Sequence, residues 1–212
     1  EIMRGLGVEI TWIEANVLRV HARHIGETRI DERLAGKLRA SIVLAGPMLG
    51  RCGEVYLPVP GGDAIGERRL DMHVFALERL GASVSFDGRG FQLRAEKLAG
   101  ADILFMEASV TATENAIMAA VLAKGTTILR NAAAEPHVQD LCQMLNALGA
   151  QIEGVGSNRL VIQGVERLHG GEARVGADFM EVGSYVGAAV MTHGEVTIQD
   201  AGPCLKHVKV VV

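Results

Sequence analysis

Aromatic residues and excess positive charge are both scarce in this sequence. It has eight Phe, Trp and Tyr residues among 212, and its formal net charge is −4. Proteins that bind nucleic acids usually present a basic surface, often with aromatic rings on which bases stack, so we expect no nucleic-acid partner. Any anionic ligand must be held by a few local arginines and by backbone N–H groups.

Long apolar runs are missing as well. No stretch reaches the roughly 18 apolar residues that a membrane-spanning helix needs, and the first residues lack the basic-then-apolar order of a signal peptide. We therefore expect a cytoplasmic protein without a membrane span.

Cysteine is rare and irregularly placed. Cys52, Cys142 and Cys204 are odd in number, far apart, and outside any Cys-x-x-Cys pattern. This argues against a disulfide framework or a zinc site and predicts buried or incidental thiols. We expect neither a metal nor an organic cofactor.

What the sequence does contain is an internal repeat. In three stretches a helix end runs through Leu-Gly into an alternating hairpin pattern, and the glycines Gly7, Gly81 and Gly149 lie 74 and 68 residues apart. Leu-Gly at a helix end is typical of a left-handed C-cap, and the alternation is typical of paired strands.

A second marker gives the same period. A small-residue helix that leads into a strand recurs three times, and its turn glycines Gly53, Gly125 and Gly194 lie 72 and 69 residues apart. Each period of about 70 residues reads as helix, strand, helix, strand, strand. Because helices rich in Ala and Gly allow close approach, we predict an α/β (α+β) fold of repeated βαβαββ units with helices packed inward against sheets.

Both ends of the sequence look cut within this period. Residues 1–7 resemble the last turns of a helix, and residues 204–212 stop where the period predicts the rest of a helix. We expect the chain to be part of a longer protein.

A glycine-rich connection is the first candidate for chemistry. Residues 57–62, Leu-Pro-Val-Pro-Gly-Gly, end a predicted strand, and a predicted helix begins near Leu70. A helix N-terminus with Arg68 and Arg69 beside it is suited to phosphate. The segment matches neither the Walker pattern nor Gly-x-Gly-x-x-Gly, so spacing alone leaves a phosphate loop and a plain turn equally possible.

Three further segments place polar residues at the start of a predicted helix. They are residues 107–120 with Ser109, Thr111, Thr113 and Glu114, residues 131–141 with Glu135 and Asp140, and residues 176–185 with Asp178 and Glu181. Such groups can cap the helix or contact a ligand. Capping is the favoured interpretation for Glu135, and both roles stay open for the others.

Together these stretches resemble one family closely. Residues 38–82, 109–141 and 162–190 resemble the UDP-N-acetylglucosamine 1-carboxyvinyltransferases. The most specific part is the run Pro-Gly-Gly-x-x-Ile-Gly-x-Arg-x-x-Asp-x-His at residues 60–73. These enolpyruvyl transferases move the enolpyruvyl group of phosphoenolpyruvate to the 3-hydroxyl of UDP-N-acetylglucosamine and release phosphate, the first committed step of peptidoglycan synthesis. The likeness covers nearly the whole chain.

The resemblance implies a fold and a domain division. Family members form an inside-out α/β barrel of two lobes, each with three βαβαββ units. Residues 1–175 would form one lobe with an incomplete first unit, and residues 176–212 would begin the second lobe. The second lobe of the same full-length chain would complete the site.

The resemblance also implies site residues. Asp63 would be catalytic, and Arg68 would lie near the phosphate of phosphoenolpyruvate, which is a co-substrate. The UDP-sugar would be contacted by Arg39, Arg68, Arg69, Leu70, Asp71, Met72, Glu107, Ala108, Ser109 and Val110.

Four positions depart from the family pattern. Arg69 replaces a usual proline, Thr111 a frequent glycine, and Glu107 a frequent lysine, which puts Glu107 in question as a nucleotide contact. Asp63 stands where most members carry the loop cysteine linked to protonation of phosphoenolpyruvate C3, to product release and to covalent attack by fosfomycin. We predict that Asp63 is a general acid in the closed complex and that fosfomycin does not alkylate the protein, because a carboxylate replaces the thiolate nucleophile.

Two alternatives remain at the level of sequence. The sister transferase that acts on shikimate 3-phosphate shares the fold and the donor, but the Pro-Gly-Gly loop favours the UDP-sugar enzyme. A non-catalytic UDP-sugar-binding or scaffold lobe is the other, because one lobe holds half of a cleft and should not turn over alone.

Overall fold

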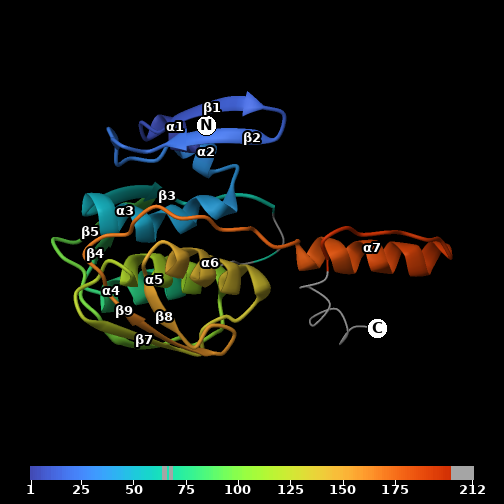
Figure 1. Ribbon diagram of the computed structural model, residues 1–212. Helices are drawn as coiled ribbons and strands as arrows, with labels where there is room; N and C mark the ends of the chain where they lie inside the picture. Colours follow the sequence, from blue (N-terminus) through green and yellow to red (C-terminus); the bar gives the residue numbers. More distant parts are fainter. Residues whose placement is uncertain (64–65, 67–68, 202–212) are drawn as a thin grey trace.

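The helices and strands follow the repeat that the sequence predicts (Figure 1). The structure is a computed structural model that describes residues 1–63, 66 and 69–201. Within it, one partial and two nearly complete units succeed one another along the chain, and a long helix follows the last unit.

The second unit spans residues 28–94. Its elements are α2 (Glu32–Ala35), the 3-10 helix η1 (Arg39–Leu44), α3 (Ala45–Cys52), β3 (Glu54–Pro58), α4 (Asp71–Arg79), β4 (Ser83–Phe86) and β5 (Gly90–Arg94). The sheet order is β3-β5-β4, with both pairs antiparallel. A single parallel bridge from Arg29 to Tyr56 stands where the repeat predicts the first strand of the unit.

The third unit spans residues 102–163 and repeats this plan. Its elements are β6 (Asp102–Leu104), α5 (Val110–Ala120), β7 (Thr126–Arg130), α6 (Pro136–Ala147), β8 (Gln151–Glu153) and β9 (Arg159–Gln163). The sheet order is β6-β7-β9-β8, with β6 parallel to β7 and the other pairs antiparallel. The two sheets therefore have the same topology, which confirms the βαβαββ repeat.

The first unit is represented by α1 (Ile2–Gly5) and a hairpin of β1 (Glu9–Glu14) and β2 (Val17–His21). In the described residues this sheet has two strands. The hairpin lies at one side of the body (Figure 1), and nearly all its residues are exposed.

The three Leu-Gly turns have the same geometry. Gly7, Gly81 and Gly149 have φ of 94°, 99° and 98°, so each occupies the left-handed region that glycine enters at little cost. After each glycine, the next N–H donates to a carbonyl five residues back, in the pairs Val8–Met3, Ala82–Leu77 and Ala150–Leu145. These are Schellman turns, and the predicted left-handed caps are confirmed.

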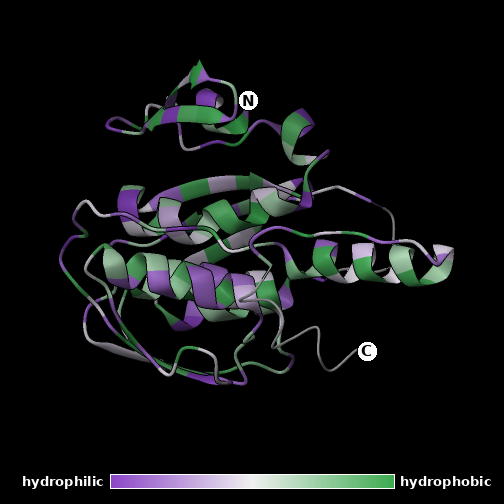
Figure 2. Cartoon of the chain, turned by 45° about the vertical axis from the view of Figure 1, so that its right-hand side comes forward, coloured by the Kyte–Doolittle hydropathy of each residue, from purple (hydrophilic) through white to green (hydrophobic). Residues whose placement is uncertain are grey.

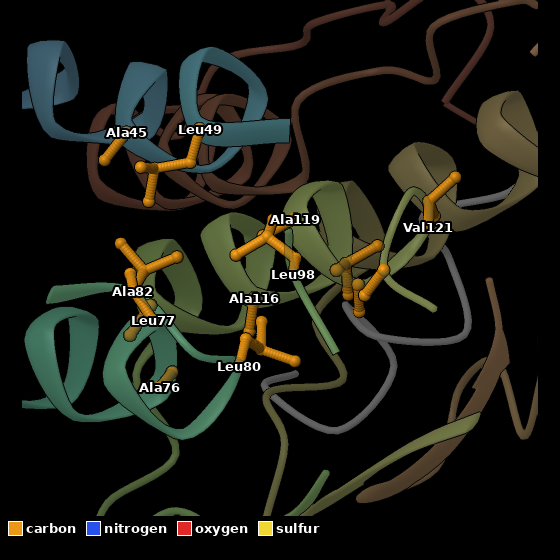
Figure 3. Close-up of a cluster of buried hydrophobic side chains, with 14 of the residues drawn as sticks. Ala45, Leu49, Ala76, Leu77, Leu80, Ala82, Leu98, Ala116, Ala119 and Val121 are labelled. Atoms are coloured by element: carbon orange, nitrogen blue, oxygen red, sulfur yellow. The ribbon is translucent and has the colours of Figure 1, made fainter. Parts of the chain in front are cut away.

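The helix α5 forms the centre of the core. Seven of its residues are buried, and it packs against α3, α4 and α6. Figure 3 shows Ala116 and Ala119 of α5 between side chains of α3 and α4. A Cβ on Gly46 of α3 would lie 2.4 Å from the carbonyl oxygen of Asn115, so only glycine allows the two helices to approach this closely. Helices lie inside and sheets outside, as predicted.

The last helix, α7 (Phe179–Thr192), extends away from the body (Figures 1 and 2). The strand predicted after Gly194 is wrong, because residues 194–198 form no ladder with another described strand. The left-handed residue at this helix end is His193, with φ of 51°. A strand needs a partner for its N–H and C=O groups, and sequence pattern alone does not supply one.

None of the helices in the described residues is long and apolar enough to cross a membrane. Cys142 is buried, which raises its pKa to about 11, and burial also raises the pKa of the partly buried Cys52. The prediction of a buried thiol is confirmed for Cys142, whereas Cys52 is only partly buried. Cys204 lies outside the described residues.

Candidate functional site

The base of the glycine-rich loop is fixed by close backbone contact. The N–H of Gly61 donates to the carbonyl of Ala35 at 3.0 Å, and a Cβ on Gly61 would lie 1.7 Å from the carbonyl oxygen of Gly36. Gly62 has φ of 99°, and its Cβ position is 3.2 Å from Arg39. Both glycines are therefore required, Gly61 for the loop to lie against the end of α2 and Gly62 for it to lie against the start of η1.

Arg39 connects this loop to the start of α4. It is the first residue of η1 and is half-buried. Its Nη2 donates to the main-chain carbonyl of Arg69 at 3.3 Å. Arg39 thus lies between Gly62 and Arg69, and its guanidinium is held where the two segments meet.

The segment Arg69–Met72 enters α4, which begins at Asp71. Arg69 Nη2 and Asp71 Oδ2 are 2.6 Å apart, but both side chains are largely exposed, so this ion pair adds little stability. Leu70 and Met72 are partly buried against the core. The apolar residues fix the backbone, and the polar side chains remain available to a ligand.

Ser109 begins α5 as a true cap. Its hydroxyl accepts from the N–H of Ala112 at 3.4 Å, and its carbonyl accepts from the hydroxyl of Thr113 at 2.8 Å. Capping is therefore confirmed as a role of Ser109 and as the local reason for the helix start. Glu107 and Ala108 precede it on an exposed turn.

A contact that we did not predict joins α4 to α5. His73 lies in the first turn of α4, and its Nε2 is 3.1 Å from the hydroxyl of Thr111 in the first turn of α5. Its Nδ1 is 2.9 Å from the Asn115 amide nitrogen. In the sequence, His73 was only the last position of the loop motif.

These contacts bring the N-terminal turns of two long helices together beside Arg39. Helix N-termini carry partial positive charge and free N–H groups, so the arrangement is suited to an anionic ligand. Of the predicted residues, Arg39, Arg69–Met72, Ser109 and Val110 are gathered here, and Glu107 and Ala108 lie one turn before α5. Asp63 is exposed at the edge of the loop, and Arg68 lies outside the described residues.

Glu135 does not cap α6, so that prediction is wrong. It occupies the N-cap position but makes no side-chain cap hydrogen bond, and its Oε2 is buried without a partner among the described residues. The reason is geometric, since the short side chains of Ser, Thr, Asp and Asn fit this bond best. Asp178 caps α7 in this way, accepting from the N–H groups of Met180 at 2.8 Å and Glu181 at 3.2 Å.

A separate hollow lies at the other ends of the central helices. It has a volume of about 650 Å³ and is lined by residues 49–53, 95–98, 122–125 and 164–166. These segments include the C-terminal ends of α3 and the turn after α5. None of the predicted site residues that the structure describes lines this hollow, so we do not include it in the candidate site.

Comparisons with known sequences point to one family. Residues 1–211 match the family model described as EPSP synthase (3-phosphoshikimate 1-carboxyvinyltransferase). Proteins named UDP-N-acetylglucosamine 1-carboxyvinyltransferase from Treponema denticola and Bradyrhizobium diazoefficiens are 54% and 53% identical, over 96% and 95% of this chain. The chain spans about half the length of these curated relatives, 47% of each.

Two solved structures have the same fold as this chain. The enolpyruvyl transferase NikO from Streptomyces tendae superposes with a TM-score of 0.73 at 22% identity, covering 89% of this chain and 45% of that chain. EPSP synthase from Acinetobacter baumannii superposes with a TM-score of 0.67 at 20% identity, covering 89% and 43%. With the repeat, the inward-packed helices and the sequence match, these findings place the chain in the EPSP synthase family of enolpyruvyl transferases.

Proposed function

We propose that this chain, within the full-length protein, takes part in transferring the enolpyruvyl group of phosphoenolpyruvate to the 3-hydroxyl of UDP-N-acetylglucosamine, with release of phosphate. The relatives of that name, at 51–54% identity, support this choice of substrates. The observation that carries it is the meeting of Arg39 with the N-terminal turns of α4 and α5, beside the loop that holds Asp63. The role would lie in peptidoglycan synthesis, in the cytoplasm.

Each part of this site has a task in the proposed reaction. The UDP-sugar diphosphate would lie against the start of α5, where Ser109 and Val110 present backbone N–H groups, and Arg39 would balance its charge. The segment Arg69–Met72 would contact the rest of the nucleotide. Arg68, which lies outside the described residues, is proposed to face the phosphate of phosphoenolpyruvate.

Asp63 is proposed as the general acid. When the sugar 3-hydroxyl loses its proton to a base and adds to C2 of phosphoenolpyruvate, C3 must gain a proton, which a carboxyl on a closing loop can deliver. Loss of a proton from C3 and cleavage of the C2–O bond to phosphate then give the enol ether product and free phosphate. Free aspartate is ionised at neutral pH, so the proton must be held by desolvation and by the phosphate anion in the closed complex. Asp63 is exposed in the structure, and we propose that it is shielded from water only when both substrates are bound.

Phosphate release from phosphoenolpyruvate by the full-length protein tests this proposal. We expect release only when UDP-N-acetylglucosamine is present, and a loss of at least about a hundredfold in kcat for Asp63→Ala, as general acids contribute about 10² to 10⁴. Asp63→Cys should retain activity and gain a stoichiometric fosfomycin adduct by mass spectrometry. An adduct on Asp63 in the unchanged protein would contradict the proposed chemistry.

The same assay separates the alternatives. Release that depends on shikimate 3-phosphate instead of the UDP-sugar would support the sister transferase. Binding of UDP-N-acetylglucosamine without release would support a scaffold role.

We also propose that residues 176–212 begin a second lobe. The exposed apolar side chains of α7, among them Tyr185 and Met191, support this division because a helix of this composition is normally covered. The second lobe of the same full-length chain would be the partner that covers it and completes the cleft.

A further inference from the structure

A buried group of three polar side chains connects α4 to α5. His73 is 3% exposed and Asn115 is fully buried, whereas Thr111 is half-buried in the first turn of α5. His73 contacts Thr111 through Nε2 at 3.1 Å and Asn115 through Nδ1 at 2.9 Å. Buried polar groups need a matching donor for every acceptor, so the hydrogen positions in this group can be assigned.

The Asn115 amide has only one possible orientation. Its Oδ1 accepts from the N–H of Gly46 at 2.8 Å, and its Nδ2 donates to the carbonyl of Ile42 at 2.8 Å. A backbone N–H can only donate and a carbonyl can only accept, so the oxygen and nitrogen cannot be exchanged. The second hydrogen of Nδ2 therefore points to His73 Nδ1.

This orientation fixes the tautomer of His73. Nδ1 must be the acceptor, so the proton of the neutral ring lies on Nε2 and is donated to Thr111 Oγ1. A proton on Nδ1 would face the amide hydrogens of Asn115. Burial, and after it the charge of Arg39, lower the pKa of His73 from 6.5 to about 4, in agreement with a neutral ring.

Thr111 is left with one unused proton. Its oxygen accepts from His73, so its own O–H must donate elsewhere, and Thr111 Oγ1 has no second hydrogen-bond partner within the described part of the chain. Thr113, two residues along, differs because its hydroxyl donates to the carbonyl of Ser109 at 2.8 Å. Of these two threonines in the first turns of α5, only Thr111 keeps a free donor among the described residues.

We propose that Thr111 is a binding residue for the UDP-sugar and that His73 is its positioning residue. His73 holds the Thr111 oxygen as an acceptor, which leaves the hydroxyl proton to donate to an anionic oxygen of the ligand beside Ser109 and Val110. The same bond sets the distance between the two segments that contact the UDP-sugar, Arg69–Met72 and Ser109–Val110. This inference rests on the proposed function and adds a side-chain donor to it.

Steady-state kinetics of the full-length protein test the role of Thr111. Thr111→Val keeps the volume and removes the hydroxyl, and we expect the KM for UDP-N-acetylglucosamine to rise about tenfold, the loss typical of one hydrogen bond to a charged group. The kcat and the KM for phosphoenolpyruvate should stay within about twofold, since the lost contact is uniform binding. Thr111→Ser should restore the KM to within about threefold of the original value.

Two further variants separate positioning from general damage. His73→Gln offers both an acceptor and a donor in place of the ring, so it should raise the KM for the UDP-sugar by only about threefold. Thr126→Val removes an exposed hydroxyl bonded to Gln163 at 2.6 Å, far from the site in β7, and should leave all constants unchanged. Nitrogen-15 NMR of His73 should show a protonated Nε2 and an unprotonated Nδ1.

The outcomes distinguish this inference from the function on which it rests. If the unchanged protein shows no release that depends on the UDP-sugar, both the proposed function and this inference are overturned. If it is active and Thr111→Val has normal KM, or loses kcat alone, only the inference is overturned. A protonated Nδ1 overturns the assignment, and Thr111→Ala replaces the valine variant if that variant does not fold.

Discussion

The helices α5 and α7 occupy corresponding places in the repeat but have opposite surroundings. Both are rich in small apolar residues. Seven of the 11 residues of α5 are buried, whereas Val182 is the one buried residue among the 14 of α7. The comparison shows that an apolar pattern specifies the helix, while burial depends on which other elements are present to cover it.

The two helices also differ in polar content. Around α5, a charge-free network of His73, Thr111 and Asn115 satisfies backbone groups of η1 and α3. Around α7, Val182 and Ala201 form a small hydrophobic cluster with three partly buried neighbours. One of these neighbours, Phe179, also stacks on the ring of His137, with centroids 5.8 Å apart. The buried region should therefore respond to pH and to packing changes, and α7 should respond weakly to both.

The largest expected effect that separates the two regions is a pH dependence centred on His73. The pKa of His73 is about 4 in the folded chain and 6.5 in the absence of the fold. Between pH 6.5 and 4, the unfolded chain therefore binds one more proton than the folded chain. The contribution of His73 to the free energy of unfolding is therefore fully present above pH 6.5, and about 3 kcal/mol of it is lost as the pH drops to 4. Urea unfolding at a series of pH values measures this loss.

His73→Gln is the control for this pH dependence. It keeps a hydrogen-bonding side chain but has no proton to gain, so the difference between the two pH curves isolates His73. The charge of Arg39, which contributes to the low pKa, is constant over this range. If the free energy of unfolding of both proteins changes with equal slope between pH 6.5 and 4, then His73 has the same pKa in the folded and unfolded states, and this prediction is wrong.

A matched pair of glycines gives the next largest effect. In Gly46→Ala the new methyl group would lie 2.4 Å from the Asn115 carbonyl oxygen, so α3 and α5 must separate at a cost of about 2 kcal/mol. In Gly187→Ala on α7 the methyl group meets nothing within 4 Å and should stabilise by up to about 1 kcal/mol through helix propensity. Free energies of unfolding in urea decide between these signs. If both variants change the free energy of unfolding equally, then α5 is not packed more tightly than α7, and this prediction is wrong.

Most features that depend on residues close together in the sequence were predicted correctly. Gly7, Gly81 and Gly149 end helices in the left-handed region without help from distant residues, so their turns and the repeat were predictable. The site role of the loop at Gly61 and Gly62 comes from the family motif, because spacing alone leaves a plain turn equally possible, and it stays a prediction. The close approach at Gly46 followed from the small-residue pattern of the helices.

Most of what failed or was missed depends on distant partners, and Glu135 is the local exception. Glu135 has a residue type that fits the cap position poorly, and the favoured interpretation overlooked its longer side chain. The strand after Gly194 needed a neighbouring strand. The contacts of His73 join residues 38 and 42 positions apart, to Thr111 and Asn115, and no periodicity within one helix predicts such a pair.

The smallest expected effect concerns two valines of α7 and tests whether a second lobe covers the helix. Val182 is 4% exposed and Val190 is 66% exposed. In this chain, Val190→Lys should change the free energy of unfolding by less than about 0.5 kcal/mol, as at most surface positions, whereas Val182→Lys should cost about 1 to 3 kcal/mol. In the full-length protein, Val190→Lys should become as costly as Val182→Lys if a second lobe packs on this face. A cost for Val190→Lys that stays below about 0.5 kcal/mol there would mean that α7 remains exposed in the full-length protein.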